Sequence, residues 1–145
     1  MIIGSVSENK TKEKRVSITP DIVKKYIDLG FEVQLTKGYA DHLGISDSSY
    51  SKMGAKVSQD ENEVFNNSNI ILQVDLFEEN KFSLIKKDTT IVGSFNVTEN
   101  KNKIEKISEN NVNVFSLEML PRITRAQAMD ILSSQANLAG YKAVL

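Results

Sequence analysis

The chain has 145 residues, 40% of them hydrophobic, which suffices for one globular domain and is too little for a self-contained two-domain enzyme. Its 18 basic and 19 acidic residues leave a net charge of −1, so no electrostatic attraction to nucleic acid or anionic lipid is expected. With no cysteine and one histidine, His42, the sequence excludes disulfides, thiolate chemistry and a multi-histidine metal site.

The hydropathy pattern predicts a soluble protein. No apolar run approaches the roughly 18 residues that a membrane span requires. The first residues lack the basic and long apolar regions of a signal peptide. We therefore expect a cytoplasmic address without direct insertion into a membrane.

Strand-like and helix-like segments alternate along the chain, which predicts an α/β fold. In chain order, the expected elements are a strand over residues 2–6, a helix over 19–30, a strand over 31–35, a helix over 46–53, a weak strand over 55–57, a strand over 69–74, a short helix over 78–87, a strand over 89–94, a helix over 99–109, a strand over 112–115 and a long helix over 124–145. The expected architecture is a mainly parallel open sheet flanked by helices, of the flavodoxin or Rossmann type, ending in a long C-terminal helix.

The helix over residues 19–30 has the clearest boundaries. Thr19 can cap its N-terminus, Pro20 suits the first turn, and Asp21 complements the helix dipole. Gly30 can close the C-terminal end.

The last helix is the most informative segment. Pro121 breaks the preceding chain, and Thr124 is a plausible cap for a helix that continues to the last residue. On a continuous helix, five polar side chains fall within roughly 80° of arc, with Ser133 just outside it. They are Gln127, Asp130, Ser134, Asn137 and Tyr141. Amides, hydroxyls and one carboxylate suit a bound polar molecule or a closely packed neighbour, but an ordinary solvated face is equally compatible with them.

Two isolated residues invite a functional interpretation. Arg15 lies in the loop after the first strand, where open parallel sheets bind ligands, so its guanidinium could grip a carboxylate or phosphate. The alternative is a surface arginine among neighbouring charges. His42 lies beside Asp41 without a nucleophile motif, which favours a surface role.

No self-sufficient catalytic constellation is present. The chain has neither the G-x-G-x-x-G fingerprint of dinucleotide-binding turns nor a phosphate-binding G-x-x-x-x-G-K-[ST] loop. Acidic pairs such as Asp60 and Glu61 lie in charged stretches typical of solvated surface. We therefore expect no catalytic acid, base or nucleophile.

The motifs at residues 15–20 (RVSITP) and 121–141 (PRITRAQAMDILSSQANLAGY) resemble the N-terminal part of the alanine dehydrogenase and nicotinamide nucleotide transhydrogenase family. The resemblance runs along the whole chain, beginning with Glu8 and the Glu13-x-Arg15-Val16 motif. Within the family, the long-helix motif is most similar to the NAD(H)-binding alpha subunit of proton-translocating NAD(P) transhydrogenase.

The resemblance implies a component that binds NAD(H) and passes its hydride to NADP on a partner component, coupled to proton movement through a membrane component. By this resemblance Arg122, Gln127, Asp130 and Ser133 contact the nicotinamide end of NAD(H). It also implies a homodimer that is peripheral at the inner membrane, on its cytoplasmic side, through its partner subunits. Hydride transfer needs orientation and exclusion of water more than an acid or base.

Two departures separate the branches of this family. Alanine dehydrogenases carry a lysine in the strand matching residues 70–74 and a histidine in the segment matching residues 95–98. This chain has Gln73 at the first position and no histidine in the second segment. The departures favour the transhydrogenase branch, although its members commonly carry a lysine at the position of Gln73 as well.

Relatives in this family continue into a dinucleotide-binding domain. We therefore expect residues 1–123 to form an α/β domain and residues 124–145 a helix that leads toward that domain, which holds most of the NAD-binding surface. The isolated chain is expected to be inactive. Two alternatives stay open at this point: an alanine dehydrogenase-type domain, and a non-catalytic α/β module for dimerisation or docking.

Overall fold

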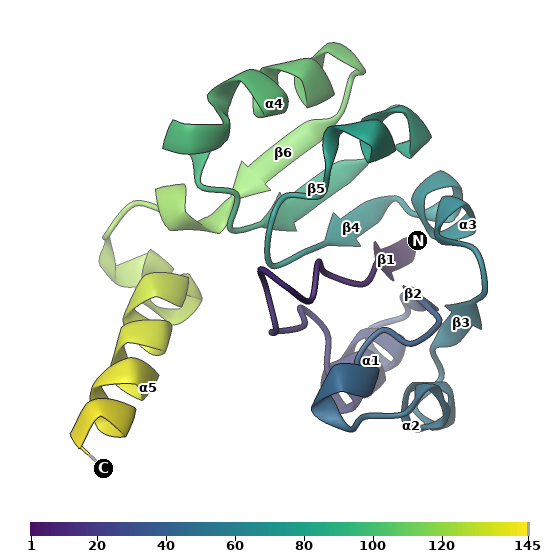
Figure 1. Cartoon of the computed structure of the whole chain (residues 1–145), viewed down its shortest axis with the longest axis horizontal. Helices are drawn as coiled ribbons and strands as arrows, with labels where there is room; N and C mark the ends of the chain where they lie inside the picture. Colours follow the sequence, from purple (N-terminus) through teal and green to yellow (C-terminus); the bar gives the residue numbers. More distant parts are fainter. Residues whose placement is uncertain (145) are drawn as a thin grey trace.

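A single parallel sheet organises the molecule. The computed structural model describes residues 1–144. Its strands are β1 (Ile2–Ser5), β2 (Glu32–Thr36), β3 (Lys56–Ser58), β4 (Ile70–Leu72), β5 (Thr90–Gly93) and β6 (Asn113–Ser116). They pair in the order β3-β2-β1-β4-β5-β6, and every pair is parallel (Figure 1). The predicted α/β fold with an open parallel sheet, of Rossmann type, is confirmed.

The strand order reverses between β1 and β4. From β1 the chain proceeds outward to β2 and β3, and from β4 it proceeds in the opposite direction to β5 and β6. We call the place where the carboxyl ends of β1 (Ser5) and β4 (Leu72) lie side by side the joint. The crossover connections diverge there and leave a crevice, which is where open α/β sheets bind ligands.

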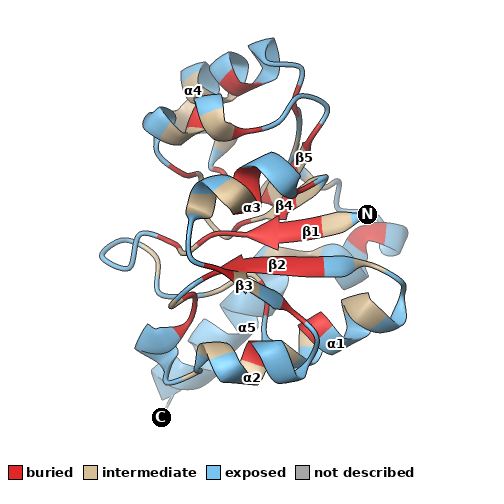
Figure 2. Cartoon of the chain, turned by 90° about the vertical axis from the view of Figure 1, so that its right-hand side faces the viewer, coloured by how far each residue is buried: buried red, intermediate tan, exposed pale blue. Residues whose placement is uncertain are grey.

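Helices cover both faces of the sheet. The α-helices are α1 (Pro20–Asp28), α2 (Asp47–Lys52), α3 (Glu61–Asn67), α4 (Val97–Glu109) and α5 (Ile131–Val144). The short 3₁₀ helices are η1 (Asp41–Leu43), η2 (Glu79–Leu84), η3 (Leu117–Met119) and η4 (Thr124–Met129). Figure 2 shows α1 and α2 on one side of the sheet, with α3 and α4 on the other. No helix within residues 1–144 combines the length and the hydrophobicity that a bilayer span requires.

Each face of the sheet has its own apolar core. Ile3, Val33 and Leu35 pack with Val23 of α1 and Tyr50 of α2. On the opposite face, residues of β4, β5, α3 and α4 form the second core: Ile71, Ile91, Val64, Phe65 and Ile107. Burial on both faces explains why the central strands are short apolar runs without polar alternation.

The predicted helix over residues 19–30 is observed as α1. Thr19 occupies the N-cap position, although its side chain makes no capping hydrogen bond, and Pro20 lies in the first turn. Gly30, at φ +86°, takes the left-handed conformation that closes the helix.

Helix α3 was missing from the sequence-based prediction. Asp60 caps it by accepting a hydrogen bond from the backbone N–H of Asn62, while Val64 and Phe65 are buried. With seven residues and one adjacent apolar pair, the segment carries no helical periodicity, so its charged residues suggested a solvated stretch. The polar segment expected as a helix over residues 78–87 forms the 3₁₀ helix η2.

The prediction of one continuous helix from Thr124 is wrong. Residues 124–129 form η4, Asp130 takes an extended conformation at ψ 95°, and α5 begins at Ile131. The Asp130 carboxylate accepts the backbone N–H groups of Leu132 and Ser133, which is the geometry of an N-cap and ends the preceding turn. The polar arc expected on a continuous helix therefore does not exist, and within it only Ser134, Asn137 and Tyr141 lie on α5.

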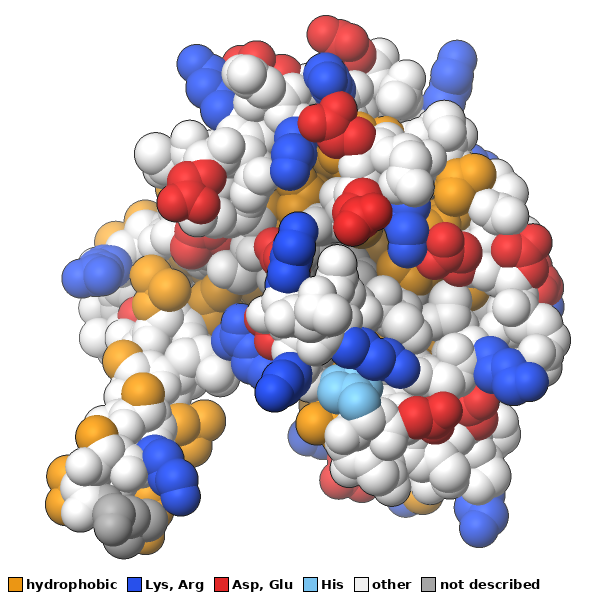
Figure 3. Space-filling view, viewed as in Figure 1, with side chains coloured by type: hydrophobic (Ala, Val, Ile, Leu, Met, Phe, Trp, Pro, Cys, Tyr) orange, Lys and Arg blue, Asp and Glu red, His pale blue; other side chains and the backbone are white. Residues whose placement is uncertain are grey.

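Helix α5 projects away from the α/β body (Figure 1). The space-filling view shows hydrophobic side chains along this projecting helix (Figure 3). The large exposed apolar residues of α5 are Leu132, Leu138, Tyr141 and Val144.

Gly93, at the carboxyl end of β5, has no room for a side chain. A Cβ atom there would lie 2.4 Å from the carbonyl oxygen of Gln73 and 2.4 Å from the ring of Phe95. Gly93→Ala should therefore lower the free energy of unfolding by about 1–3 kcal/mol, as overpacking does, measured by urea denaturation. Gly140→Ala is the matched control, because nothing lies within 4 Å of the added methyl group and the site is helical. Equal stability of both variants would contradict the close contact at Gly93.

Candidate functional site

The carboxyl ends of β1 and β4 are joined by direct hydrogen bonds. Glu8, in the loop after β1, accepts the backbone N–H of Val74 at 2.6 Å. Gln73 follows β4, and its Oε1 accepts the Ser5 hydroxyl at 3.0 Å and the Val6 N–H at 3.1 Å. These bonds span the reversal of strand order and fix the two loops to each other.

A buried tyrosine anchors the loop that carries Arg15. The Tyr39 hydroxyl lies 2.8 Å from the Ser5 Oγ and 2.9 Å from the Ser17 Oγ. It also accepts the backbone N–H groups of Ser17 and Ile18, both at 3.2 Å. Burial raises the pKa of Tyr39, so the neutral hydroxyl is the form that holds this network.

Arg15 is held by the carboxylate of Glu13. Its Nε donates to Oε1 of Glu13 at 2.9 Å and its Nη2 donates to Oε2 at 2.7 Å, a two-pronged ion pair. The hydrogen bond from Arg15 lowers the pKa of the Glu13 carboxyl. The remaining arm, Nη1, donates to Oε1 of Gln135 on α5 at 3.3 Å. The prediction that Arg15 contacts a ligand stays a prediction.

A cleft of about 460 Å³ lies beneath that contact. Its walls come from the Arg15 loop, from the ends of β4 and β5, and from the first turns of α5. Gln73, which stands where alanine dehydrogenases carry a lysine, is buried and lines the cleft.

The four residues expected at a nicotinamide line one pocket. Arg122, Gln127, Asp130 and Ser133 share a hollow of about 570 Å³ with Leu132 and two alanines. Arg122 comes from the segment before η4, Gln127 from η4 and Ser133 from the first turn of α5, so the break at Asp130 places them around a common space. That these residues contact a cofactor stays a prediction.

Asp130 is the anionic group of this pocket. The Ser133 hydroxyl donates to its Oδ2 at 2.6 Å, and the Ser133 and Leu132 N–H groups donate to Oδ1 at 3.0 Å. The bonds from Ser133 lower the pKa of Asp130, and the positive charge of Arg122 contributes to the same shift. The carboxylate is therefore ionised at neutral pH and serves as a hydrogen-bond acceptor.

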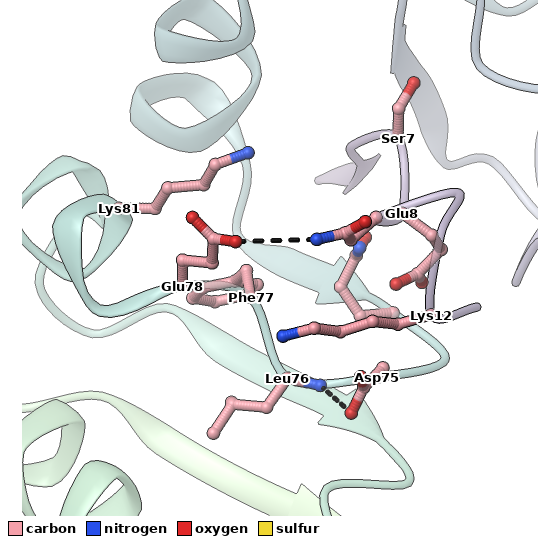
Figure 4. Close-up of a pocket in the computed structure, with 10 residues that line it drawn as sticks. Ser7, Glu8, Lys12, Asp75, Leu76, Phe77, Glu78 and Lys81 are labelled. Carbon is pink, nitrogen blue, oxygen red and sulfur yellow. Dashed lines mark hydrogen bonds between the residues drawn. The ribbon is translucent and has the colours of Figure 1, made fainter.

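A third hollow, of about 240 Å³, lies next to Glu8 in the loop after β1 (Figure 4). Glu8 is 8% exposed, and burial raises the pKa of its carboxyl to about 7 against the hydrogen bonds from Val74 and Asp75. The carboxylates of Asp75 and Glu13 raise the pKa further. The site prediction missed Glu8, since a single glutamate in a polar loop carries no sequence signal of burial.

His42 and the segment at residues 95–98 lie outside these hollows. His42 is exposed, and its Nε2 lies 2.7 Å from the Lys14 carbonyl oxygen, which agrees with the predicted surface role. Asn96 is the N-cap residue of α4, in the left-handed conformation at φ +46°. The Glu118 carboxylate accepts the flanking N–H groups of Phe95 and Val97, both at 3.2 Å.

The buried Glu8 carboxyl makes stability depend on pH. Its pKa is about 7 in the folded chain against 4.5 for an ordinary glutamate, so its contribution to stability is complete below about pH 4.5 and is lost as the pH rises through 7. Glu8→Gln keeps an acceptor for Val74 without this proton. Between about pH 4.5 and about pH 8, the wild-type chain should lose up to about 3 kcal/mol of unfolding free energy relative to Glu8→Gln. Urea denaturation at both pH values measures the change, and carbon-13 NMR titration of the carboxyl gives the pKa. A difference that does not vary with pH would contradict the assignment.

Residues 4–139 match the family described as "Alanine dehydrogenase/PNT, N-terminal domain". The NAD(P) transhydrogenase subunit alpha of Cereibacter sphaeroides is 33% identical over 145 residues, covering 100% of this chain and 28% of that protein. Alanine dehydrogenase 1 of Staphylococcus aureus is 28% identical over 145 residues, covering 100% of this chain and 38% of that protein.

The fold of a solved relative is also similar. The crystal structure of transhydrogenase from Sinorhizobium meliloti superposes with a TM-score of 0.92 at 34% identity, over 99% of this chain and 43% of that one. This chain thus spans between 28% and 43% of the length of these relatives. Because the family match runs almost from end to end, the chain belongs to the alanine dehydrogenase/PNT N-terminal domain family.

Proposed function

We propose that this chain is the first domain of the NAD(H)-binding component of an NAD(P) transhydrogenase. That enzyme transfers a hydride between NAD(H) and NADP(H), coupled to proton translocation. The observation that carries the proposal is the pocket that gathers Arg122, Gln127, Asp130 and Ser133.

The residues of this pocket fit the nicotinamide end of NAD(H). A carboxamide has an N–H₂ donor and a carbonyl acceptor, so it needs one partner of each kind. The ionised carboxylate of Asp130 would accept from the amide, and the Arg122 guanidinium would donate to its carbonyl. Gln127 and Ser133 add neutral hydrogen-bonding groups.

The rest of the cofactor would bind outside these residues. The chain contains no G-x-G-x-x-G turn to cradle a pyrophosphate. In the proposed assembly, a dinucleotide-binding domain after residue 145 holds the pyrophosphate and adenosine, and this domain covers the nicotinamide.

The chemistry proposed for this domain is orientation and exclusion of water. Bound nicotinamide supplies the hydride, and its transfer between two rings requires no proton donor on the protein. Arg122 and Asp130 would set the rotation of the carboxamide, while Leu132 and Ala126 present an apolar wall that keeps water from the ring.

The partners follow from the same proposal. An NADP-binding component and a membrane component would complete the enzyme, and a second copy of the component would form a homodimer. The domain itself would lie on the cytoplasmic side of the inner membrane, held there through its partner subunits.

Alanine dehydrogenase is the alternative within the family, and two observations disfavour it. Gln73, buried at the end of β4, has no basic group with which to bind a substrate carboxylate. Residues 95–98 contain no histidine, and Asn96 at that place is the exposed N-cap of α4. The third candidate, a non-catalytic docking module, does not explain why the donors and acceptors gather around one hollow.

Replacing Arg122 or Gln127 should impair hydride transfer while the fold stays intact. In a protein completed with the dinucleotide-binding domain and the NADP-binding partner, we expect Arg122→Ala and Gln127→Ala to lower the rate by about 10- to 100-fold, because the ring loses its orientation. The measurement is reduction of an NADP analogue by NADH.

Arg125→Ala is the matched control for that experiment, since Arg125 lies on η4 and does not line the pocket. An equal loss of rate in Arg125→Ala would count against the assigned roles, as would full activity in Arg122→Ala. NADH oxidation that depends on ammonia and pyruvate in the completed protein would instead support the alanine dehydrogenase alternative.

The 145-residue chain alone should bind NADH weakly or not at all, because it offers one side of the nicotinamide site and no pyrophosphate site. Isothermal titration calorimetry of the isolated chain with NADH checks this expectation. Tight, stoichiometric binding would show that the main cofactor surface lies within these residues. It would overturn the proposal that a separate dinucleotide-binding domain holds most of the cofactor.

A further inference from the structure

Helix α5 depends on few contacts with the rest of the domain. Among residues 1–144, one side-chain hydrogen bond joins α5 to a loop of the sheet, from Nη1 of Arg15 to Oε1 of Gln135. The other hydrogen bonds of the first turns of α5 are local and involve Asp130, Ile131 and their neighbours. Helix α5 also lies close to η3, and Leu117 of η3 and Leu132 of α5 line the same cleft.

The guanidinium of Arg15 is oriented before it reaches α5. The Glu13 carboxylate accepts three N–H groups of this residue: Nε, Nη2 and the backbone N–H at 2.7 Å. Glu13 itself is well covered, with 14% of its side chain exposed. The planar guanidinium of Arg15 is therefore held in one orientation, in which Nη1 points to α5.

This arrangement leaves Arg15 poorly suited to a ligand anion. A carboxylate or phosphate that took the two-pronged face of the guanidinium would have to displace Glu13, which would then lose its hydrogen bonds to Nε and Nη2. The free arm already has an acceptor in Gln135.

We propose that Arg15 is a positioning residue that holds α5, through Gln135, over the carboxyl ends of β4 and β5. Glu13 sets the direction of the guanidinium, and Arg15 closes one side of the cleft between the sheet and the helix. Asp130 and Ser133 form the N-terminal cap of the same helix, so the contact also sets where these two side chains stand. The proposal concerns the geometry of the domain and does not depend on which ligand the cleft takes.

Charge changes at residue 135 test the contact in the 145-residue chain. Glutamate, lysine and glutamine have similar helix propensities, so Gln135→Glu and Gln135→Lys change the partner of Arg15 more than the helix. A helix of 14 residues is marginal in water once it is undocked, so amide hydrogen exchange over residues 131–144 reports the attachment of α5. Amides of β1 serve as the internal reference.

We expect exchange in α5 to slow by about two- to fivefold in Gln135→Glu and to accelerate by a similar factor in Gln135→Lys, as exposed charge pairs do. Arg15→Met should accelerate exchange in α5. In the Arg15→Met background, Gln135→Glu should no longer slow that exchange, because the negative charge of Glu13 is then left unbalanced. Arg15→Lys should restore part of the protection, since it keeps the charge and loses the fork.

Two outcomes would overturn the proposal. One is equal exchange over α5 in the wild type and in Arg15→Met. The other is a difference in α5 exchange between Gln135→Glu and Gln135→Lys that stays the same when Arg15 is replaced. That result would assign the difference to the helix dipole. Exchange at β1 and the urea midpoint of each variant show whether the body of the domain has stayed folded.

Discussion

The joint between β1 and β4 fixes the loops that line the cleft beside the first turns of α5. Parallel pairing brings the two carboxyl ends side by side, and the chain then leaves them in opposite directions. Glu8 and Gln73 bind the opposite loop across this joint. The Arg15 loop is in turn held by Tyr39, which bonds to Ser5 at the end of β1. These bonds fix the loops that form the walls of the cleft beside α5.

The charged groups of the cleft and the pocket each have a hydrogen-bond partner of the complementary kind. Arg15 is neutralised by Glu13, and Asp130 accepts the donors of its own helix turn. Glu8 accepts the Val74 N–H and is also buried, and its pKa of about 7 keeps a large share of it uncharged at neutral pH. In the role proposed for the domain, these groups would orient a polar ligand, and hydride transfer depends on that orientation.

Much of the fold could be predicted because its signals are local. The apolar runs of β1, β4 and β5, the alternating pattern of β2 and the boundaries of α1 follow from periodicity and capping residues within a few positions. Helix α3 was missed because its stability comes from burying Val64 and Phe65 against the sheet. The break at Asp130 was missed because a helical wheel assumes continuity, whereas this carboxylate competes for the amides of the next turn.

The sequence by itself determined the alternation of strands and helices, the family motif and the residue types available to the site. Those properties reside in neighbouring residues and need no knowledge of distant contacts. Only the tertiary structure decided that Arg122, Gln127, Asp130 and Ser133 surround one hollow, that Glu8 is buried, and that Arg15 reaches α5. The reason is physical: burial and hydrogen bonding depend on residues that folding brings together, and Arg15 and Gln135 are 120 positions apart in the chain.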